Sequence, residues 1–148
     1  MAPTPVPPLK LLAQDAEDLA VVSAALQDAI GKVGDIHWEP GRRQLTVAVN
    51  RFRWEAGGKA ERIRSAVQVG GVMAVKARKI RRDAKRAVLE LLAVTFEPGE
   101  APGGAVVFGF AGGADLRVEV ECLDVVLADV SKAWPAVAEP RHDDEPGS

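Results

Sequence analysis

A two-residue repeat of apolar side chains runs through much of the chain after Asp35 and limits what it can fold into. In residues 45–49, and again in residues 116–122, an apolar side chain stands at every second position. Successive side chains of a strand point to opposite faces, so this pattern predicts strands with one buried and one solvated face. Such strands are typical of antiparallel sheets, and the rhythm of strands alternating with long helices that marks a parallel sheet is absent.

The sequence predicts an α+β fold built on a mostly antiparallel meander sheet of six or seven strands. Alternating or continuous apolar runs between turn-forming residues mark the strands. They are residues 36–38, 45–54, 63–69, 72–80, 88–96, 106–110 and 116–122, and residues 9–13 could form a first strand. The run 88–96 is long enough for a central strand.

Helical spacing occurs near each end of the chain. Asp15 is the expected N-cap of a first helix, because its side chain can accept a hydrogen bond from the first turn. Apolar residues follow at spacings of three and four until Gly31 supplies a stop; they are Leu19, Val22, Leu26 and Ile30. Similar spacing in residues 123–130 predicts a short second helix.

Three short segments are expected to shape the connections. Residues 39–42 fit a type II turn, with a proline and a glycine at its centre. A bulge near residues 50–51 would explain why the apolar phase shifts to Phe52 and Trp54. Gly70-Gly71 favours a hairpin turn, although the pair could also be a bulge in one longer strand.

The chain is expected to form one domain, residues 9–134, between two disordered tails. Its 148 residues suit a single domain, and its hydrophobic fraction of 47% excludes a wholly disordered chain. Residues 1–8 hold four prolines and no apolar segment of a signal peptide, and residues 135–148 are acidic and proline-rich. One unpaired cysteine and no export signal make the cytoplasm the expected location. The longest uncharged stretch, residues 101–114, is too short and glycine-rich to span a membrane, so no membrane contact is expected.

Charge is strongly segregated along the chain, although the net charge is only −2. Residues 42–86 hold fourteen bases against three acids, a net of +11. Residues 1–41 hold two bases and six acids, and residues 87–148 hold three and twelve, so these segments carry −4 and −9. Such asymmetry predicts an anionic partner or the pairing of two oppositely charged surfaces of one molecule.

The basic segment could place its cations on one face of the sheet. On a two-residue repeat, pairs such as Arg62 and Arg64 point the same way, and residues 81–86 add the densest cluster. The candidate binding residues are Arg51, Arg53, Arg62, Arg64, Lys76, Arg78, Arg81, Arg82, Lys85 and Arg86. Such a face fits the phosphates of nucleic acid or an acidic protein surface.

Two alternatives remain open for this segment. Phe52 and Trp54 interleave with arginines as stacking platforms do, but their phase equally suits the core, which we favour. Glu90, Glu119 and Glu121 are expected on strands of the same sheet, and cross-strand pairs with them would consume the positive charge internally. A solvated face of mixed charge would then need no partner.

Residues that carry chemistry are scarce. Cys122 has the apolar phase of its strand and is expected to be an inert core thiol, whereas His37 is expected to be a solvated or edge histidine. Glu119 and Glu121 share a strand face, where alternating glutamates are most often solvated. With one Cys, two His and no phosphate-binding glycine motif, we expect no metal, no cofactor and no catalytic residue.

Six short strings, taken in their order and spacing, add a family resemblance. They are residues 26–29 (LQDA), 32–36 (KVGDI), 50–55 (NRFRWE), 91–98 (LLAVTFEP), 110–113 (FAGG) and 118–123 (VEVECL). As a set they resemble a family of small alphaproteobacterial proteins described only as a domain of unknown function, over about residues 9–134. The resemblance implies no activity, cofactor or catalytic residue, so it adds no site to those above.

We therefore predict a non-enzymatic binding or accessory domain that uses the basic face of residues 42–86 for an anionic partner. The first alternative is a small enzyme or ligand-binding domain with a pocket near His37 and the carboxylates. The second is a structural subunit of a homo-oligomer, closed by sheet-edge or apolar contacts. The positions of the fourteen bases on the surface would separate an open basic face from a paired one.

Overall fold

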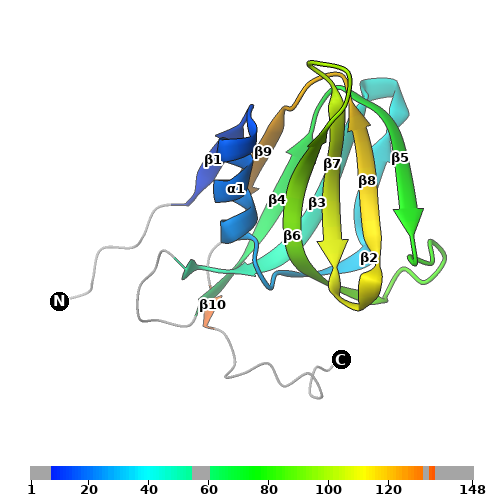
Figure 1. The fold of residues 1–148 in the computed structure, drawn as a ribbon. Coiled ribbons are helices and arrows are strands. Elements are labelled where there is room, and N and C mark those ends of the chain that lie inside the picture. Colours follow the sequence, from blue (N-terminus) through cyan, green and yellow to red (C-terminus); the bar gives the residue numbers. More distant parts are fainter. Residues whose placement is uncertain (1–7, 55–60, 132–133, 136–148) are drawn as a thin grey trace.

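One bent antiparallel sheet with a single helix makes up the part of the chain that the computed structural model describes, residues 8–54, 61–131 and 134–135 (Figure 1). Nine strands lie side by side in the order β1-β9-β4-β3-β2-β6-β7-β8-β5, and a two-residue strand, β10, pairs with β4 beside this path. The mostly antiparallel sheet with a helix near the N-terminus is confirmed, but the expected number of six or seven strands is wrong. Most of both expected tails lies outside the described residues.

The strands are β1 (Lys10–Ala13), β2 (Ile30–Glu39), β3 (Gln44–Phe52), β4 (Glu61–Val69), β5 (Val72–Arg78), β6 (Val88–Pro98), β7 (Gly104–Phe110), β8 (Asp115–Val120), β9 (Val125–Asp129) and β10 (Trp134–Pro135). The helix is α1 (Ala16–Ala25), and the short 3-10 turns η1 (Pro40–Arg42) and η3 (Ala111–Gly113) join strands. The meander is present in two parts, β2-β3-β4 and β6-β7-β8. It is interrupted because β9 returns to pair with β4, and β5 pairs with β8.

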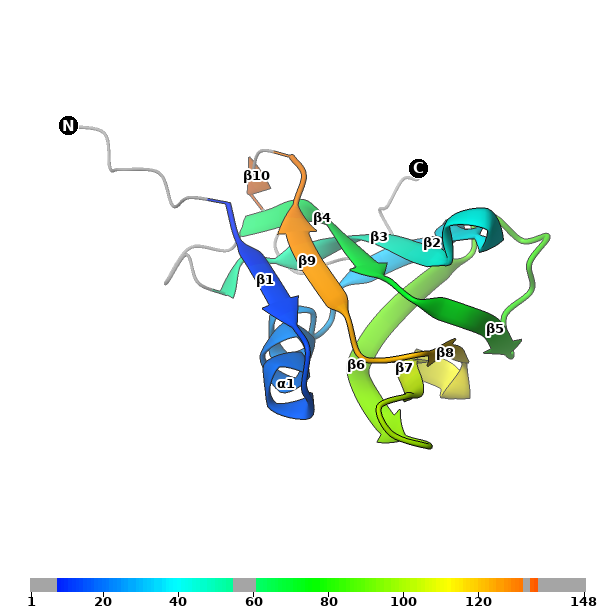
Figure 2. The same cartoon turned by 90° about the horizontal axis from the view of Figure 1, so that it is seen from above.

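The sheet bends where β2 meets β6. These two strands pair over only three residues each, 30–32 and 88–90, and then separate. Figure 2 shows β3, β4 and β9 on one side of the molecule and β6, β7 and β8 on the other, with α1 beside β1 and β6. One continuous buried cluster joins both sides and the helix, with members such as Val67, Phe108 and Leu19. Burial of this apolar surface is the main stabilising contribution to the fold.

The helix α1 begins where the sequence predicts but ends earlier. The Asp15 carboxylate accepts a hydrogen bond from the Asp18 N–H at 2.8 Å, which satisfies a free donor of the first turn. The helix ends at Ala25, whereas Ile30 opens β2 and pairs with residues of both β3 and β6. Sheet pairing therefore overrides the helical spacing there. The described residues contain no helix with the length and hydropathy needed to cross a bilayer.

Strand β3 runs without the expected bulge. Its register with β4 is continuous along the whole strand, so Arg51 takes the inward position that follows Val49. Phe52 and Trp54 consequently lie off the core face: Phe52 is half-buried, and the Trp54 side chain is 52% exposed. The predicted bulge and the favoured core placement of both rings are wrong. The strand keeps its alternation without a shift, so Arg51, and not Phe52, takes the next inward position.

Gly70-Gly71 joins β4 to β5, but these two strands do not pair with each other. The Gly70 N–H donates to the Asp124 carbonyl at 3.0 Å, and the Gly71 carbonyl accepts from the Glu121 N–H at 3.0 Å. Gly71 has a φ of 64°, which favours glycine. The expected hairpin is wrong because the chain crosses here from one side of the bent sheet to the other, and both glycines bond to the β8–β9 connection.

The predicted second helix is the strand β9. Leu123, Val125 and Leu127 are buried at every second position, and β9 pairs with β4 on one side and β1 on the other. A strand paired on both sides can carry apolar residues on both faces. The run 123–130 therefore shows helical and strand spacing at once, and its distant pairing partners decide between them.

The connection between β2 and β3 is longer than the expected type II turn, because four residues, 40–43, separate the paired Glu39 and Gln44. Residues 40–42 form η1, and Arg43, rather than Gly41, has a left-handed φ of 53°. The Arg43 N–H donates to the Pro40 carbonyl at 3.0 Å. This turn sends β3 back antiparallel to β2.

Candidate functional site

Arg51, the first member of the predicted basic face, points into the molecule. It is fully buried, and its guanidinium donates to the Asp129 carboxylate at 2.9 and 3.0 Å and to the Ser65 hydroxyl at 3.2 Å. Asp129 also accepts from the Ser65 hydroxyl and from the Leu9 N–H, each at 2.7 Å. Burial favours the neutral carboxyl, but the bonds from Arg51, Ser65 and Leu9 outweigh it and hold the pKa of Asp129 below its ordinary value. The Arg51 charge is thus matched inside the protein.

Most other bases on the strands, or directly beside a strand end, are paired with carboxylates. The pairs are Arg53 with Glu61, Arg64 with Asp35 and Lys76 with Glu119, each at 3.1 Å, and also Arg78 with Asp115 and Arg43 with Glu121. Arg53 is buried like Arg51, so neither reaches the surface of the sheet. The strand part of the predicted basic face is therefore largely neutralised, as the alternative of internal pairing describes.

The connection between β5 and β6 gathers most of the described bases that lack such partners. Residues 79–86 are termed the basic loop, and its bases are all exposed: Lys79, Arg81, Arg82, Lys85 and Arg86. In the described part of the chain, the one carboxylate within 4.0 Å of any of them is that of Asp83, at 3.7 Å from Arg81, and both of these side chains are 80% exposed. Such an exposed pair contributes little, so the loop carries a net positive charge at the surface.

The basic loop is anchored to β2 and to the core. The Gly34 N–H donates to the Lys85 carbonyl at 2.9 Å, and the Val33 N–H donates to the Ala87 carbonyl at 3.0 Å. A Cβ on Gly34 would lie 3.0 Å from the Lys85 carbonyl oxygen, so this close approach favours glycine. Ile80 packs against the core cluster. The loop therefore holds its cations on a defined frame.

Two aromatic rings and an arginine form a second surface feature, termed the aromatic cluster: Phe52, Trp54 and Arg62. The Arg62 guanidinium lies 3.8 Å from the centroid of the Phe52 ring, a cation–π contact, and donates to the Asn50 carbonyl at 3.1 Å. The Phe52 and Trp54 ring centroids are 5.2 Å apart, with an interplanar angle of 51°. Burial lowers the pKa of Arg62, with Asp28 opposing the shift, but an arginine remains charged at neutral pH.

His37 and Cys122 give no support to a catalytic site. His37 is exposed, as predicted. Cys122 is also exposed, so its expected core placement is wrong: β8 ends at Val120, and the alternation does not continue into the following turn. Among the residues that the structure describes, no three His, Cys, Asp or Glu side chains are placed to hold a metal ion.

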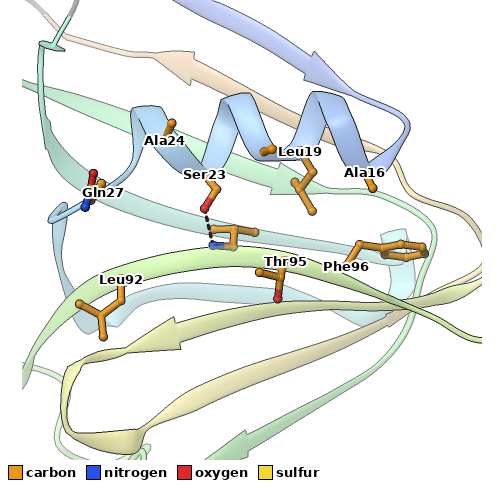
Figure 3. A pocket seen from close by; sticks show the side chains of 10 residues that line it. Ala16, Leu19, Ser23, Ala24, Gln27, Leu92, Thr95 and Phe96 are labelled. Atoms are coloured by element: carbon orange, nitrogen blue, oxygen red, sulfur yellow. Dashed lines mark hydrogen bonds between the residues drawn. The ribbon is translucent and has the colours of Figure 1, made fainter.

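A shallow apolar hollow of about 470 Å³ lies between α1 and β6 (Figure 3). Small side chains of α1 line one wall, and Leu92, Thr95 and Phe96 line the other. The Ser23 hydroxyl accepts the Val94 N–H at 2.9 Å and so holds α1 against β6, beyond the residues that pair with β2. No charged residue and no predicted site residue lines this hollow, so it is not the pocket expected near His37.

Glutamates line a second hollow of about 400 Å³, between the β6–β7 connection and β8. Its carboxylates are those of Glu97, Glu100, Glu119 and Glu121. Arg117 lies among them, and its hydrogen bond to Glu97 at 2.6 Å raises the pKa of Arg117. Lys76 forms an ion pair with Glu119 and Arg43 forms one with Glu121, so neighbouring bases balance most of this acidic charge.

Sequence reasoning missed Lys79 and the partner of Arg51. Lys79 could have been found, because residues 79–86 hold five bases among eight positions. Asp129 could not, because it lies 78 residues from Arg51 along the chain and only the β4–β9 pairing brings it close.

Fold and surface together define the class: a small domain with a bent antiparallel sheet, one helix and an anchored basic loop. The chain belongs to the family described as "Protein of unknown function (DUF2948)", whose model matches residues 9–142. This confirms the resemblance to a domain of unknown function, and the match continues past residue 134. Comparison with curated proteins and with solved structures gave no match.

Proposed function

We infer that this protein is a non-enzymatic binding domain of the cytoplasm that holds an anionic partner at its basic loop. The observation that supports this is the loop itself, where five exposed bases lie within eight residues and four of them have no carboxylate partner among the described residues. Because the strand bases are mostly paired, the loop retains the positive charge left over from the segregation along the chain. The exposed, free thiol of Cys122 suits a reducing compartment.

The anchored loop also favours binding on physical grounds. Like charges held close together repel one another, and an anion placed among them relieves this repulsion. Hydrogen bonds from Gly34 and Val33 to the Lys85 and Ala87 carbonyls already fix the C-terminal end of the loop, so less backbone entropy is lost there when a partner binds. Each phosphate neutralised by a base releases counterions, and the affinity should fall as salt rises.

The test is binding of inorganic polyphosphate, measured by calorimetry at low and at physiological salt. A loop variant replaces Lys79, Arg82, Lys85 and Arg86 with Ala. A matched control replaces four bases elsewhere, the exposed Lys10, Arg42 and Arg43 and the half-buried Arg117, and lowers the net charge equally. We expect the loop variant to lose about tenfold or more in affinity at low salt, with a shallower salt dependence. The control should stay within about twofold of the parent protein.

Two results would contradict the proposal. One is the absence of polyphosphate binding by the parent protein even at low salt. The other is an equal loss in the loop variant and the control, since net charge rather than the loop would then govern binding. Circular dichroism of both variants checks that the sheet is intact, which we expect because none of the eight replaced residues is buried.

A further inference from the structure

The geometry points to single-stranded nucleic acid as the anionic partner, with its phosphates at the basic loop and an unstacked base on the aromatic cluster. This inference rests on the proposed function and adds the class of partner. It draws on an observation that the loop does not explain, namely a tryptophan ring exposed beside a phenylalanine that carries an arginine on its face.

The aromatic cluster has the chemistry of a stacking platform. Trp54 is 52% exposed, although burial of a ring of this size is favourable. Arg62 covers the Phe52 ring and is fixed by its bond to the Asn50 carbonyl, so the rings lie beside a held positive charge. Base stacking on aromatic side chains, helped by arginine, is the means by which proteins bind single strands without reading their sequence.

A continuous line of contacts joins this cluster to the basic loop. Lys85 is bonded through its carbonyl to Gly34, and the next residue, Asp35, is paired with Arg64 at 3.1 Å. Arg64 donates to the Asn50 side chain at 3.2 Å, and Asn50 also holds Arg62. In Figure 1 the end of β3 lies at the lower left of the molecule and the basic loop at the lower right, so a bound strand would run across the lower end between them. A strand of several nucleotides can therefore follow one end of the protein from phosphate contacts to a stacked base.

The same features argue against a duplex and against an acidic protein. In a duplex the bases are stacked on each other, and readout requires an element that enters a groove. The described helix α1 carries Glu17 and Asp18 and no base, so it does not suit a negatively charged groove. An acidic protein surface would satisfy the loop but would leave the rings of the aromatic cluster without a matching group.

The experiment compares two labelled 16-mers by fluorescence anisotropy: oligo-dT and an abasic strand with the same number of phosphates. Trp54→Ala tests stacking, Trp54→Phe tests rescue, and Met73→Ala is the control, because Met73 is 56% exposed on β5 and outside the aromatic cluster. We expect Trp54→Ala to weaken dT binding by about tenfold and to leave abasic binding unchanged. Trp54→Phe should recover most of the loss, and the loop variant should weaken both ligands. Oligo-rU in the same assay identifies whether the strand is RNA or DNA.

Each possible outcome bears on one of the two proposals. Equal affinity for dT and the abasic strand, with both weakened in the loop variant, would overturn the nucleic-acid inference and leave the anionic partner standing. So would tighter binding of a 16-base-pair duplex or of polyglutamate than of dT. If none of these polyanions binds at low salt, the proposed function itself fails. Tighter binding of dT or rU than of the abasic strand, lost in Trp54→Ala, supports the inference.

Discussion

At the scale of single residues, the buried Arg51 shows how a charge can occupy a core position. Moving a guanidinium out of water is costly, and the cost is offset only by close, well-directed acceptors. The Asp129 carboxylate provides these acceptors: it accepts two hydrogen bonds from the arginine, and it accepts two more from the Ser65 hydroxyl and the Leu9 N–H. These four residues come from β3, β9, β4 and the position directly before β1, so the ion pair ties together strands of one side of the sheet.

The pH dependence of stability tests this ion pair. The pKa of Asp129 is lowered on folding, so its carboxylate stabilises the fold above the ordinary carboxyl pKa, and this contribution is lost as pH falls through the lower folded value. Asp129→Asn keeps the shape but leaves Arg51 unmatched, which should cost about 3 kcal/mol or more of unfolding free energy at neutral pH. Urea titrations should show the gap between the two proteins narrowing as the pH is lowered from neutral to below the ordinary aspartate pKa of 3.8.

The exposed Asp83 provides the control for that series. Asp83→Asn should change the unfolding free energy by less than about 0.5 kcal/mol at either pH, because its pair with Arg81 is solvated. A gap between the parent protein and Asp129→Asn that stays constant from neutral to acid pH would contradict the role given to the carboxylate.

The sequence could not assign Arg51 correctly, and the reason is physical. The local pattern sets the phase of a strand, and an arginine at an inward position is more often a sign that the phase has shifted. What overrides this rule is an acceptor that comes from 78 residues further along the chain. The same unshifted phase accounts for the exposure of Trp54. Because Arg51 occupies the inward position, the two aromatic rings lie off the core face.

At the scale of elements, the tight connection from β6 to β7 depends on Gly104. A Cβ at this position would lie 2.6 Å from the Phe96 ring and closer still to the Glu97 carbonyl oxygen. We expect Gly104→Ala to lower the unfolding free energy by about 2 kcal/mol, because the pairing of Pro98 with residue 104 would have to open.

Gly41→Ala is the matched control for this substitution. No heavy atom lies within 4 Å of a Cβ placed there, so its unfolding free energy should change by less than about 0.5 kcal/mol in the same urea titration. Equal effects of the two substitutions would show that the close contacts at Gly104 do not limit stability.

The sequence predicts elements well where their signals are local. The N-cap at Asp15 and the approximate places of β6, β7 and β8 follow from capping, apolar runs and glycine-rich turns within a few residues. The failures share a different origin. The end of α1, the strand β9 and the crossing at Gly70-Gly71 all depend on which distant strand is the neighbour, and a local pattern does not contain that information.

At the scale of the whole molecule, the segregated charge of the sequence becomes a difference between two ends. The basic loop follows the end of β5, and the glutamate-lined hollow lies near the start of that strand, beside the end of β8. The negative charge of the hollow is largely balanced by Arg117, Lys76 and Arg43. No comparable set of described acids balances the positive charge of the loop. For the proposed anionic partner, a field of this shape would orient the molecule with its loop toward the partner and would raise the rate of encounter.

Thermal stability gives a whole-molecule test of this arrangement. A ligand that binds only the folded state at one hundred times its Kd adds about 2.7 kcal/mol to the unfolding free energy. For a chain of this length, that corresponds to a rise in Tm of about 5 to 10 °C. Excess polyphosphate should produce such a rise in the parent protein and in the control that lacks Lys10, Arg42, Arg43 and Arg117. The loop variant, whose affinity should be about tenfold lower or weaker still, should show about half of this rise or less. Its own Tm without ligand should be equal to or above that of the parent, because removing clustered like charges relieves repulsion. A rise of the same size in the loop variant would place the anion site elsewhere on the molecule.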